Sequence, residues 1–349
     1  MSSYLQTTLT TFPIPNHLLL AEQPLPFILD DFALALYLGV RCKTLWYCVT
    51  AKKDLYSTFT IAKANGKRRP IHHPKRILKY VQRRISQVIL SKLPVLPCVG
   101  AYVKGKSCRD SAEQHVQKNV LIKLDLQDFF PSHTRTRVRN FFKALGYSHW
   151  VAGLIGDLCT VHENGRHFVP QGSPASPSLC NHIAQRYLDA PLLAALEGSG
   201  WTYTRYSDDL ALSHADAVTR SEVDALIARV DALTKSAGYR INWKKLRIQR
   251  PPTRQKMLGM VVNQHPNIPR DVYRRYRNII FNCLEYGFFP NALRYGGEFI
   301  DAPQAFASHL KGKVSYFQSI NPVHGAQLAE VLQRAIERHQ NENFEDVYT

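Results

Sequence analysis

Hydrophobic residues recur along this chain with two spacings, one typical of helices and one typical of strands. Apolar side chains three or four positions apart mark one face of the segment that follows Pro74 and of the segment from Ser221 to Ala237, which predicts two amphipathic helices. Between them, the nearly continuous apolar run from Val120 to Leu126 predicts a short strand that is buried on both faces. The chain is therefore expected to combine helices with sheet.

Two further patterns predict β-hairpins. Strand-forming residues from Thr58 to Lys63 are followed by Asn65-Gly66, a strong turn signal, and then by a returning segment. The segment from Tyr203 to Leu212 likewise predicts two short strands around the turn Ser207-Asp208-Asp209. The first hairpin would carry cations at its tip, and the second would carry two adjacent carboxylates.

The adjacent carboxylates gain significance from a third acid. An isolated Asp-Asp pair is usually a solvated turn, because Asp is a common turn residue. Asp125, however, ends the predicted buried strand, where a charge is costly unless it is paired or bound to metal. If that strand lies beside the hairpin, Asp125 joins Asp208 and Asp209, and three carboxylates could hold two Mg²⁺ ions about 4 Å apart, as in-line nucleotidyl transfer requires.

Net charge points to a polyanionic partner. The chain of 349 residues has a formal charge of +18, and such an excess is typical of proteins that bind nucleic acid. Residues 55–109 hold 13 Lys or Arg and no acid, and residues 240–277 hold 11 with Asp271 as the one acid. In the helix after Pro74, the residues Arg76, Lys79 and Arg83 either contact phosphates or form a solvated face.

Individual side chains suggest nucleotide contacts. Lys67 and Arg69 follow the Asn65-Gly66 turn of the first hairpin. They could hold a triphosphate, Arg69 through two hydrogen bonds and Lys67 as a point charge. Gln171 opens the Pro/Gly/Ser loop that ends at Pro177 and could hydrogen-bond a base or a sugar. Beyond Asn263 the chain predicts a helical unit rich in Arg and Tyr that grips a duplex through phosphates.

Cysteine usage and hydropathy bear on the compartment. The seven Cys include no CxxC pair, which favours reduced thiols and argues against a zinc site. No apolar run is long enough to span a bilayer and the N-terminus lacks signal-peptide features. We therefore expect a cytoplasmic protein without a membrane partner.

Three motifs carry a resemblance to a known family. Asp125-Leu126-Gln127-Asp128-Phe129-Phe130 resembles motif A of reverse transcriptases, the loop Gln171–Pro177 resembles motif B, and Tyr206-Ser207-Asp208-Asp209 resembles the Tyr-X-Asp-Asp box. Their order and spacing are similar to those of bacterial enzymes of the retron and group II intron type, over roughly residues 59–321. Where retron enzymes usually carry Asn-Ala-X-X-His and Val-Thr-Gly, this chain has Ser111–His115 and Met257-Leu258-Gly259.

The resemblance implies an α+β right-hand polymerase fold with fingers, palm and helical thumb. An N-terminal arm and fingers would occupy residues 1–118. The palm, an antiparallel sheet flanked by helices, would occupy 119–262, with a finger insertion at about 134–170, and the thumb 263–349.

The resemblance also implies roles for individual residues. Asp125, Asp208 and Asp209 would be catalytic and, with the Leu126 carbonyl, would bind two Mg²⁺, with Mn²⁺ as the alternative ion. Phe130 would be the steric gate that excludes a ribose 2′-hydroxyl, and Arg69 would hold the dNTP. Further implied or expected contacts with nucleotide or nucleic acid are those of Lys245 of motif D, Gly259 near the primer grip, Arg274, Arg277, Lys311 and Lys313.

The function implied is that of an RNA-directed DNA polymerase. As a retron enzyme, it would use dNTPs to copy a structured noncoding RNA, primed from a 2′-hydroxyl, into RNA-linked DNA (msDNA), within an anti-phage defence system that has a separate effector protein. The alternatives are a group II-like or abortive-infection polymerase, the latter extending DNA without a template, and a non-catalytic RNA-binding protein. The intact motif B loop and Phe130 favour templated synthesis. The three carboxylates argue against pure binding, since clustered negative charge repels nucleic acid.

Overall fold

The chain folds into two compact units, seen in a computed structural model that describes residues 25–62, 66, 68–300 and 302–339. One unit comprises Met1–Ser107 and Ile122–Ile248, and the other comprises Cys108–Leu121 and Gln249–Thr349. The predicted boundaries at residues 118 and 262 stay predictions.

A four-stranded sheet is the centre of the first unit, and its strand order is β6-β7-β3-β8. In the antiparallel β6–β7 hairpin, Tyr206 pairs with Asp209, so the turn consists of Ser207 and Asp208, and Asp209 already belongs to the strand. β3 lies next to β7, which meets the condition for Asp125 to join Asp208 and Asp209. Lys123 is the one residue of β3 that is only half-buried. The strands are β3 (Val120–Asp125), β6 (Thr202–Tyr206), β7 (Asp209–His214) and β8 (Arg247–Gln249).

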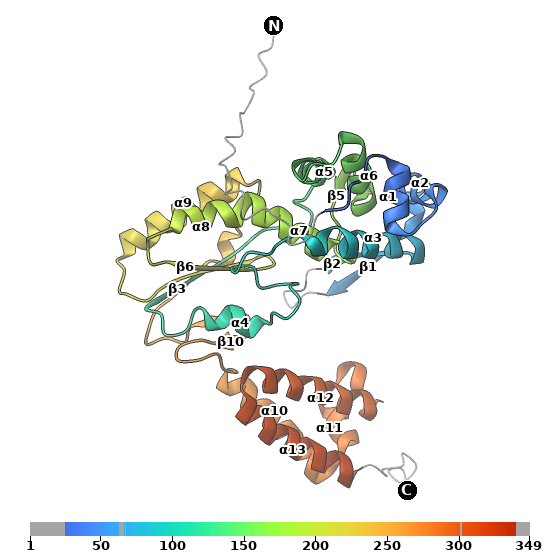
Figure 1. Ribbon diagram of the computed structural model, residues 1–349. Coiled ribbons are helices and arrows are strands. Elements are labelled where there is room, and N and C mark those ends of the chain that lie inside the picture. Colours follow the sequence, from blue (N-terminus) through green and yellow to red (C-terminus); the bar gives the residue numbers. More distant parts are fainter. Residues whose placement is uncertain (1–24, 63–65, 67, 301, 340–349) are drawn as a thin grey trace. The chain divides into compact units, whose positions relative to one another are not determined.

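Helices run along one face of this sheet (Figure 1). The amphipathic helix expected after Ser221 is confirmed, and a capping box between Thr219 and Glu222 begins it. The helical segment between Ser176 and Leu196 is interrupted by a π-helical segment, Gln185–Asp189, which apolar spacing alone does not reveal. These helices are α7 (Ser176–Ala184), α8 (Ala190–Leu196) and α9 (Arg220–Ser236).

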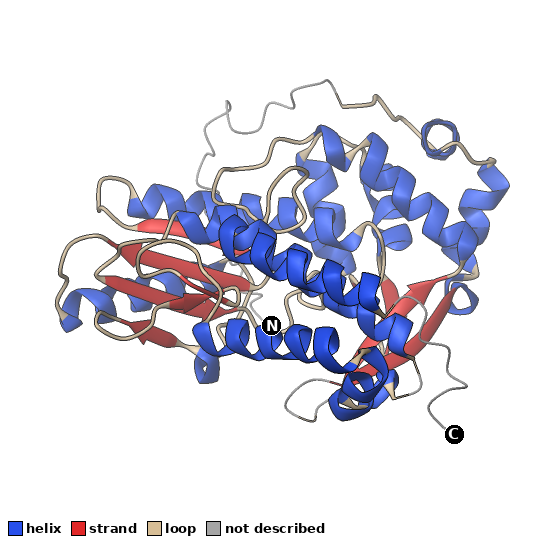
Figure 2. Cartoon of the chain, turned by 90° about the horizontal axis from the view of Figure 1, so that it is seen from below, coloured by secondary structure: helices blue, strands red, loops and turns tan. Residues whose placement is uncertain are grey.

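A second group of elements in the same unit carries the basic finger. Figure 2 shows the β1–β2 hairpin as a group of strands separate from the four-stranded sheet. The helix expected after Pro74 is confirmed as α3, with Leu78, Val81 and Ile85 buried. The elements are α1 (Asp31–Leu38), α2 (Cys42–Thr50), β1 (Tyr56–Ala62), β2 (Arg68–Pro74), α3 (Arg76–Val88), α5 (Arg135–Ala144), α6 (His149–Cys159), β4 (Val161–Glu163) and β5 (Arg166–Phe168), with short 3₁₀ turns at Lys52–Leu55, Leu90–Lys92 and Trp243–Lys245.

Residues 239–242 have a composition that favours a strand, yet the chain there makes one isolated bridge, between Ile241 and Leu126. Tyr239 and Ile241 are buried, so burial rather than strand pairing accounts for their apolar character.

The second unit is mostly helical, as expected for the Arg- and Tyr-rich region. Aromatic contacts fill its interior: Tyr276 meets Phe317 with ring centroids 5.5 Å apart, and Phe299 meets Phe306 at 5.6 Å. Its elements are α4 (Cys108–Glu113), the two-residue strands β9 (Lys256–Met257) and β10 (Met260–Val261), α10 (Arg270–Tyr286), α11 (Phe288–Tyr295), a 3₁₀ turn at Gly297–Phe299, α12 (Pro303–Ile320) and α13 (Pro322–Arg338).

Within the described part of the chain, no single helix is both long and apolar enough to cross a membrane. α1 and α2 meet the length and composition criteria only when taken together, across a bend of 100°.

Candidate active site

Three acids meet where the ends of two neighbouring strands come together. Asp125 is the last residue of β3, and Asp208 and Asp209 lie at the turn into β7. The backbone N–H of Leu126 donates to the carbonyl of Asp208 over 2.8 Å, which joins the two strand ends directly. The strand's acid and the hairpin's acids therefore come together at the level of the backbone, and their catalytic and metal-binding roles stay predictions.

The carboxylates influence one another electrostatically. Burial raises the pKa of Asp209 to about 6, and repulsion from Asp208 and Asp125 contributes to that rise. Burial also raises the pKa of Asp208, again with a contribution from Asp125. The carboxylates of Asp208 and Asp209 thus repel each other when both are ionised. A hard divalent cation bound between them would stabilise their ionised forms.

Asp125 is held by two neighbouring side chains. Its Oδ1 accepts from Nζ of Lys245 at 2.5 Å, and its Oδ2 accepts from Nδ2 of Asn242 at 3.3 Å. The Asn242 N–H donates to the Asp125 carbonyl at 2.7 Å, so this segment is anchored to the end of β3. The ion pair with Asp125 raises the pKa of Lys245, which keeps the ammonium charged.

The Asp125 carboxylate is paired with a lysine and, within the described ranges, is not part of a preformed group of metal ligands. Among the residues that the structure describes, no three Asp, Glu, His or Cys side chains are arranged to hold a metal ion. The Asp125 carboxylate instead faces the Lys245 ammonium. Since 60% of the Lys245 side chain is exposed, the ammonium can move away from Asp125 without unfolding its surroundings.

Further cations act on these carboxylates. Arg69, an exposed residue of β2, lowers the pKa of Asp208 through its charge, although burial keeps that pKa raised. Lys123 has the same effect on Asp209. The structure thus brings the predicted triphosphate ligand Arg69 within electrostatic reach of the acids, whereas Lys67 lies outside the described residues.

Phe130 is supported by other aromatic rings. Its ring centroid lies 5.5 Å from that of Phe129 and 6.4 Å from that of Tyr102. Phe129 in turn stacks on Tyr239 at 5.8 Å. Nδ1 of the buried His133 donates to the Phe129 carbonyl over 2.7 Å, and Nε2 therefore accepts from the Tyr239 hydroxyl at 2.9 Å. Burial holds the pKa of His133 well below its usual range, so this support is an uncharged hydrogen-bonded chain.

The motif B loop is fixed to the finger strand. The His72 N–H donates to the Gln171 carbonyl at 2.8 Å, and a Cβ on Gly172 would lie 2.6 Å from the His72 carbonyl oxygen. Ser173 Oγ donates to Gln82 Oε1 at 2.8 Å. The glycine is therefore required by close packing against β2, and the role of the Gln171 side chain toward a nucleotide stays a prediction.

A family model described as reverse transcriptase (RNA-dependent DNA polymerase) matches residues 61–262, more than half of the chain. The chain belongs to the reverse transcriptase family. The predicted polymerase fold and the predicted enzyme class, RNA-directed DNA polymerase, are thereby confirmed.

Curated relatives place this reverse transcriptase in the retron type. The retron Mx65 reverse transcriptase of Myxococcus xanthus is 34% identical over 334 residues, which cover 90% of this chain and 74% of that protein. The retron Ec86 reverse transcriptase of Escherichia coli is 31% identical over 241 residues, 68% of this chain and 73% of that protein. The retron Mx162 enzyme of M. xanthus is 34% identical over 281 residues, 72% of this chain and 58% of that protein, so the match spans less than two thirds of its length.

The residues predicted to bind nucleic acid fall into two groups. Arg76, Lys79 and Arg83 of α3 line a hollow of about 750 Å³ in the first unit, together with Lys75 and Tyr80. The other five belong to the second unit of this reverse transcriptase. Gly259 occupies the turn between β9 and β10, Arg274, Arg277 and Lys311 are exposed on α10 and α12, and Lys313 lies 5.8 Å from the Tyr276 ring.

Three residues of the site were not singled out from the sequence. Asn242 precedes Lys245 and holds Asp125. Lys123 is the one cation in a strand whose other residues are apolar except for the terminal Asp125, a signal that could have identified it. Tyr102 has a φ of 58° and its hydroxyl lies 3.3 Å from Ser207 Oγ. The contact of Tyr102 with Phe130 depends on tertiary packing and could not be predicted from the local sequence.

Proposed function

We propose that this reverse transcriptase is a retron enzyme that copies a structured noncoding RNA into DNA by two-metal nucleotidyl transfer. The observation that carries this proposal is the meeting of Asp125 with Asp208 and Asp209, joined through the Leu126–Asp208 hydrogen bond and electrostatically coupled. These three acids and the Leu126 carbonyl would hold two Mg²⁺, with Mn²⁺ as the alternative. When bound, the ions supply activation of the primer 3′-hydroxyl and neutralisation of the leaving pyrophosphate.

Lys245 and Arg69 complete the chemistry. In the free protein, Lys245 compensates the charge of Asp125. During the reaction, the Lys245 ammonium would contact the triphosphate and give a proton to the departing pyrophosphate. Arg69 presents a planar guanidinium suited to two oxygens of the same triphosphate. Phe130 would lie under the sugar and exclude a 2′-hydroxyl.

The names of the relatives support a wider setting for the proposal. Reverse transcriptases act on nucleic-acid templates, and the similar proteins above are named as retron enzymes. The partners proposed are a structured RNA that serves as template and primer, the msDNA product joined to it, and a separate effector protein in anti-phage defence. The formal charge of +18 supports such polyanionic partners.

Primer extension on an RNA template tests the catalytic proposal. Asp208→Asn should lower dNTP incorporation by at least about 100-fold, because a ligand for the transition-state cations is lost. Its thermal midpoint should equal or exceed that of the wild type, since a half-buried repelled charge is removed. Asp216→Asn is the matched control, because that side chain is 89% exposed and lies outside the site.

Other outcomes would redirect the proposal. Product made without template would favour the abortive-infection type of polymerase, and RNA binding without incorporation at any Mg²⁺ or Mn²⁺ concentration would favour a non-catalytic binder. Sequencing the nucleic acid that copurifies tests the retron assignment. One structured RNA linked to DNA is expected, whereas a broad mixture of cellular RNA would contradict it.

A further inference from the structure

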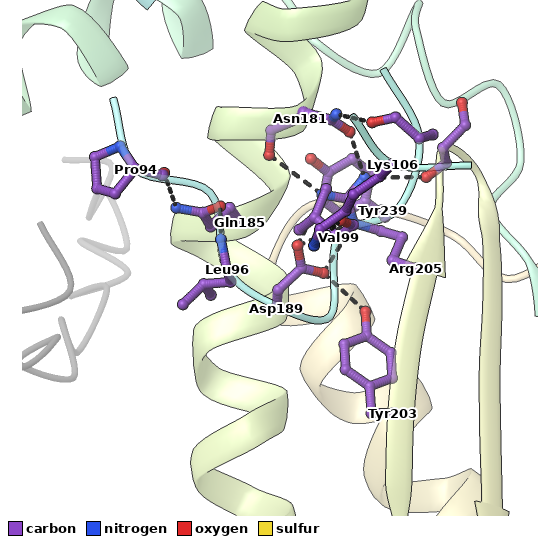
Figure 3. A network of polar contacts seen from close by, with 12 residues as sticks. Pro94, Leu96, Val99, Lys106, Asn181, Gln185, Asp189, Tyr203, Arg205 and Tyr239 are labelled. Carbon is purple, nitrogen blue, oxygen red and sulfur yellow. Dashed lines mark hydrogen bonds and ion pairs between the residues drawn. The ribbon is translucent and has the colours of Figure 1, made fainter. Parts of the chain in front are cut away.

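A fully buried arginine lies two residues before the catalytic turn. Arg205 of β6 has no exposed surface, and neither does its partner Asp189. Nε and Nη2 of Arg205 donate to the Asp189 carboxylate over 2.7–3.0 Å, and Tyr203 donates its hydroxyl to the same carboxylate at 2.8 Å (Figure 3). A buried ion pair is weak evidence for stability, because well-packed apolar residues often serve as well. Its role must be found in what else it contacts.

The remaining branch of the guanidinium reaches the turn itself. Nη1 donates to the Ser207 carbonyl at 3.2 Å and to Oδ1 of Asn181 at 2.9 Å. Ser207 has a φ of 60°, a conformation that Gly adopts readily and other residues rarely adopt. The Ser207 carbonyl belongs to the peptide unit that leads into Asp208, so this hydrogen bond fixes the orientation from which the acids project.

The helix behind the sheet is shaped to hold this arginine. Asn181 and Asp189 both bind Arg205 although they are eight positions apart, and in an α-helix residues about seven apart share a face. The π-helical segment Gln185–Asp189 adds the one extra residue that brings both side chains to the same face. Such π segments occur often at functional sites.

A neighbouring loop is tied to the same arginine. The Arg205 N–H donates to the Cys98 carbonyl at 2.8 Å and its carbonyl accepts from Gly100 at 2.9 Å. Asn181 Nδ2 donates to the Ala101 carbonyl at 2.6 Å, directly before Tyr102. The guanidinium also lies 5.7 Å from the Phe129 ring centroid. Arg205 therefore connects the catalytic turn with the segments that carry Tyr102 and Phe130, through its backbone, its guanidinium and its partner Asn181.

We propose that Arg205 is a positioning residue, which fixes the Ser207 peptide and thereby the geometry in which Asp208 and Asp209 accept cations. This inference rests on the proposed function. It predicts that the Ser207 contact serves catalysis, whereas the Asp189 pair serves to keep the guanidinium buried and aligned.

A double variant separates positioning from folding. Arg205→Met combined with Asp189→Leu removes both buried charges, so the core stays compatible with folding, but the Ser207 carbonyl loses its donor. We expect circular dichroism and RNA binding like those of the wild type, kcat for dNTP incorporation reduced by about 100-fold, and a higher Mg²⁺ concentration for half-maximal rate. Tyr203→Phe is the matched control: it removes one hydrogen bond from Asp189, leaves the Ser207 contact intact, and should keep kcat within about two-fold.

A second variant and a second readout keep the test decisive. If the double variant does not fold, Arg205→Lys retains a charge beside Asp189 but cannot span to Ser207, and the same losses are expected. Mn²⁺ affinity of the nucleic-acid-free protein, measured by titration calorimetry, should fall in the folded variant and not in Tyr203→Phe. Wild-type kcat and Mn²⁺ affinity in a folded Arg205 variant would overturn the inference, as would an equal loss in Tyr203→Phe. A wild-type chain that binds Mn²⁺ but makes no DNA would instead refute the proposed function.

Discussion

At the scale of single residues, the candidate sugar contact is a ring held by other rings. Phe130 is half-buried and lies against Phe129 and Tyr102. Because Phe129 is fixed from behind by Tyr239 and His133, the Phe130 ring has little freedom to retreat from a bulkier sugar. Discrimination by shape requires such a rigid surface.

Replacing that ring should relax sugar selection. Phe130→Ala is expected to lower the ratio of kcat/KM for dNTP over rNTP by about 10- to 100-fold, the range that a change of shape in an apolar pocket supports. Single-nucleotide incorporation with matched dNTP and rNTP measures this ratio. Phe32→Ala, at a ring that is 69% exposed on α1, should leave it unchanged. An unaltered dNTP/rNTP ratio in Phe130→Ala would contradict the proposed role of Phe130 in sugar selection.

At the scale of elements, the motif B loop and the finger hairpin behave as one assembly. Gln171 accepts from His72 of β2, and Gly172 lies against the same backbone with a φ of 113°. β2 also carries Arg69, so the position of the loop and that of the proposed triphosphate ligand are linked through a single strand.

A methyl group on Gly172 should break this assembly. Gly172→Ala would strain a positive φ and also place Cβ 2.6 Å from the His72 carbonyl oxygen. Gly146→Ala is the matched control, with a φ of 99° and nothing within 4 Å of the added atom. We expect about 1 kcal/mol of destabilisation in the control and about 1–3 kcal/mol more for Gly172, measured by urea unfolding, with a raised KM for dNTP in Gly172→Ala alone. Equal destabilisation of the two variants would contradict the packing argument.

The elements also show what the sequence could and could not reveal. Apolar periodicity located α3 and α9, because each helix buries one face, and a nearly continuous apolar run located β3, because almost all of its side chains are buried. The π-helical segment before α8 could not be predicted from the sequence, because one added residue in a turn shifts the helical phase without changing the amino-acid composition. The ion pair between Lys245 and Asp125 could not be predicted either, because the two residues are 120 positions apart in the sequence and only the folded chain brings them together.

At the scale of the whole molecule, burial keeps His115, His133 and His182 neutral. Burial lowers the pKa of His115 and of His182 to about 4, and that of His133 lies well below its usual value. Each would ionise near pH 6.5 in the unfolded chain. The unfolded chain therefore binds more protons than the folded one between about pH 4 and 6.5, and folding stability must decrease as the pH falls through that window.

His182 of α7 allows this effect to be isolated. Its folded pKa of about 4 implies that the wild type loses about 2 kcal/mol of unfolding free energy through this residue between pH 7.5 and pH 5. His182→Gln keeps a polar side chain but cannot titrate, so its loss over the same interval, measured by urea unfolding at both pH values, should be smaller than that of the wild type by about 2 kcal/mol. The exposed His149 provides the control, since His149→Gln should leave the wild-type loss unchanged. If His182→Gln lost as much stability as the wild type, the buried ring would have to be protonated in the folded chain, and the low pKa that its burial implies would be wrong.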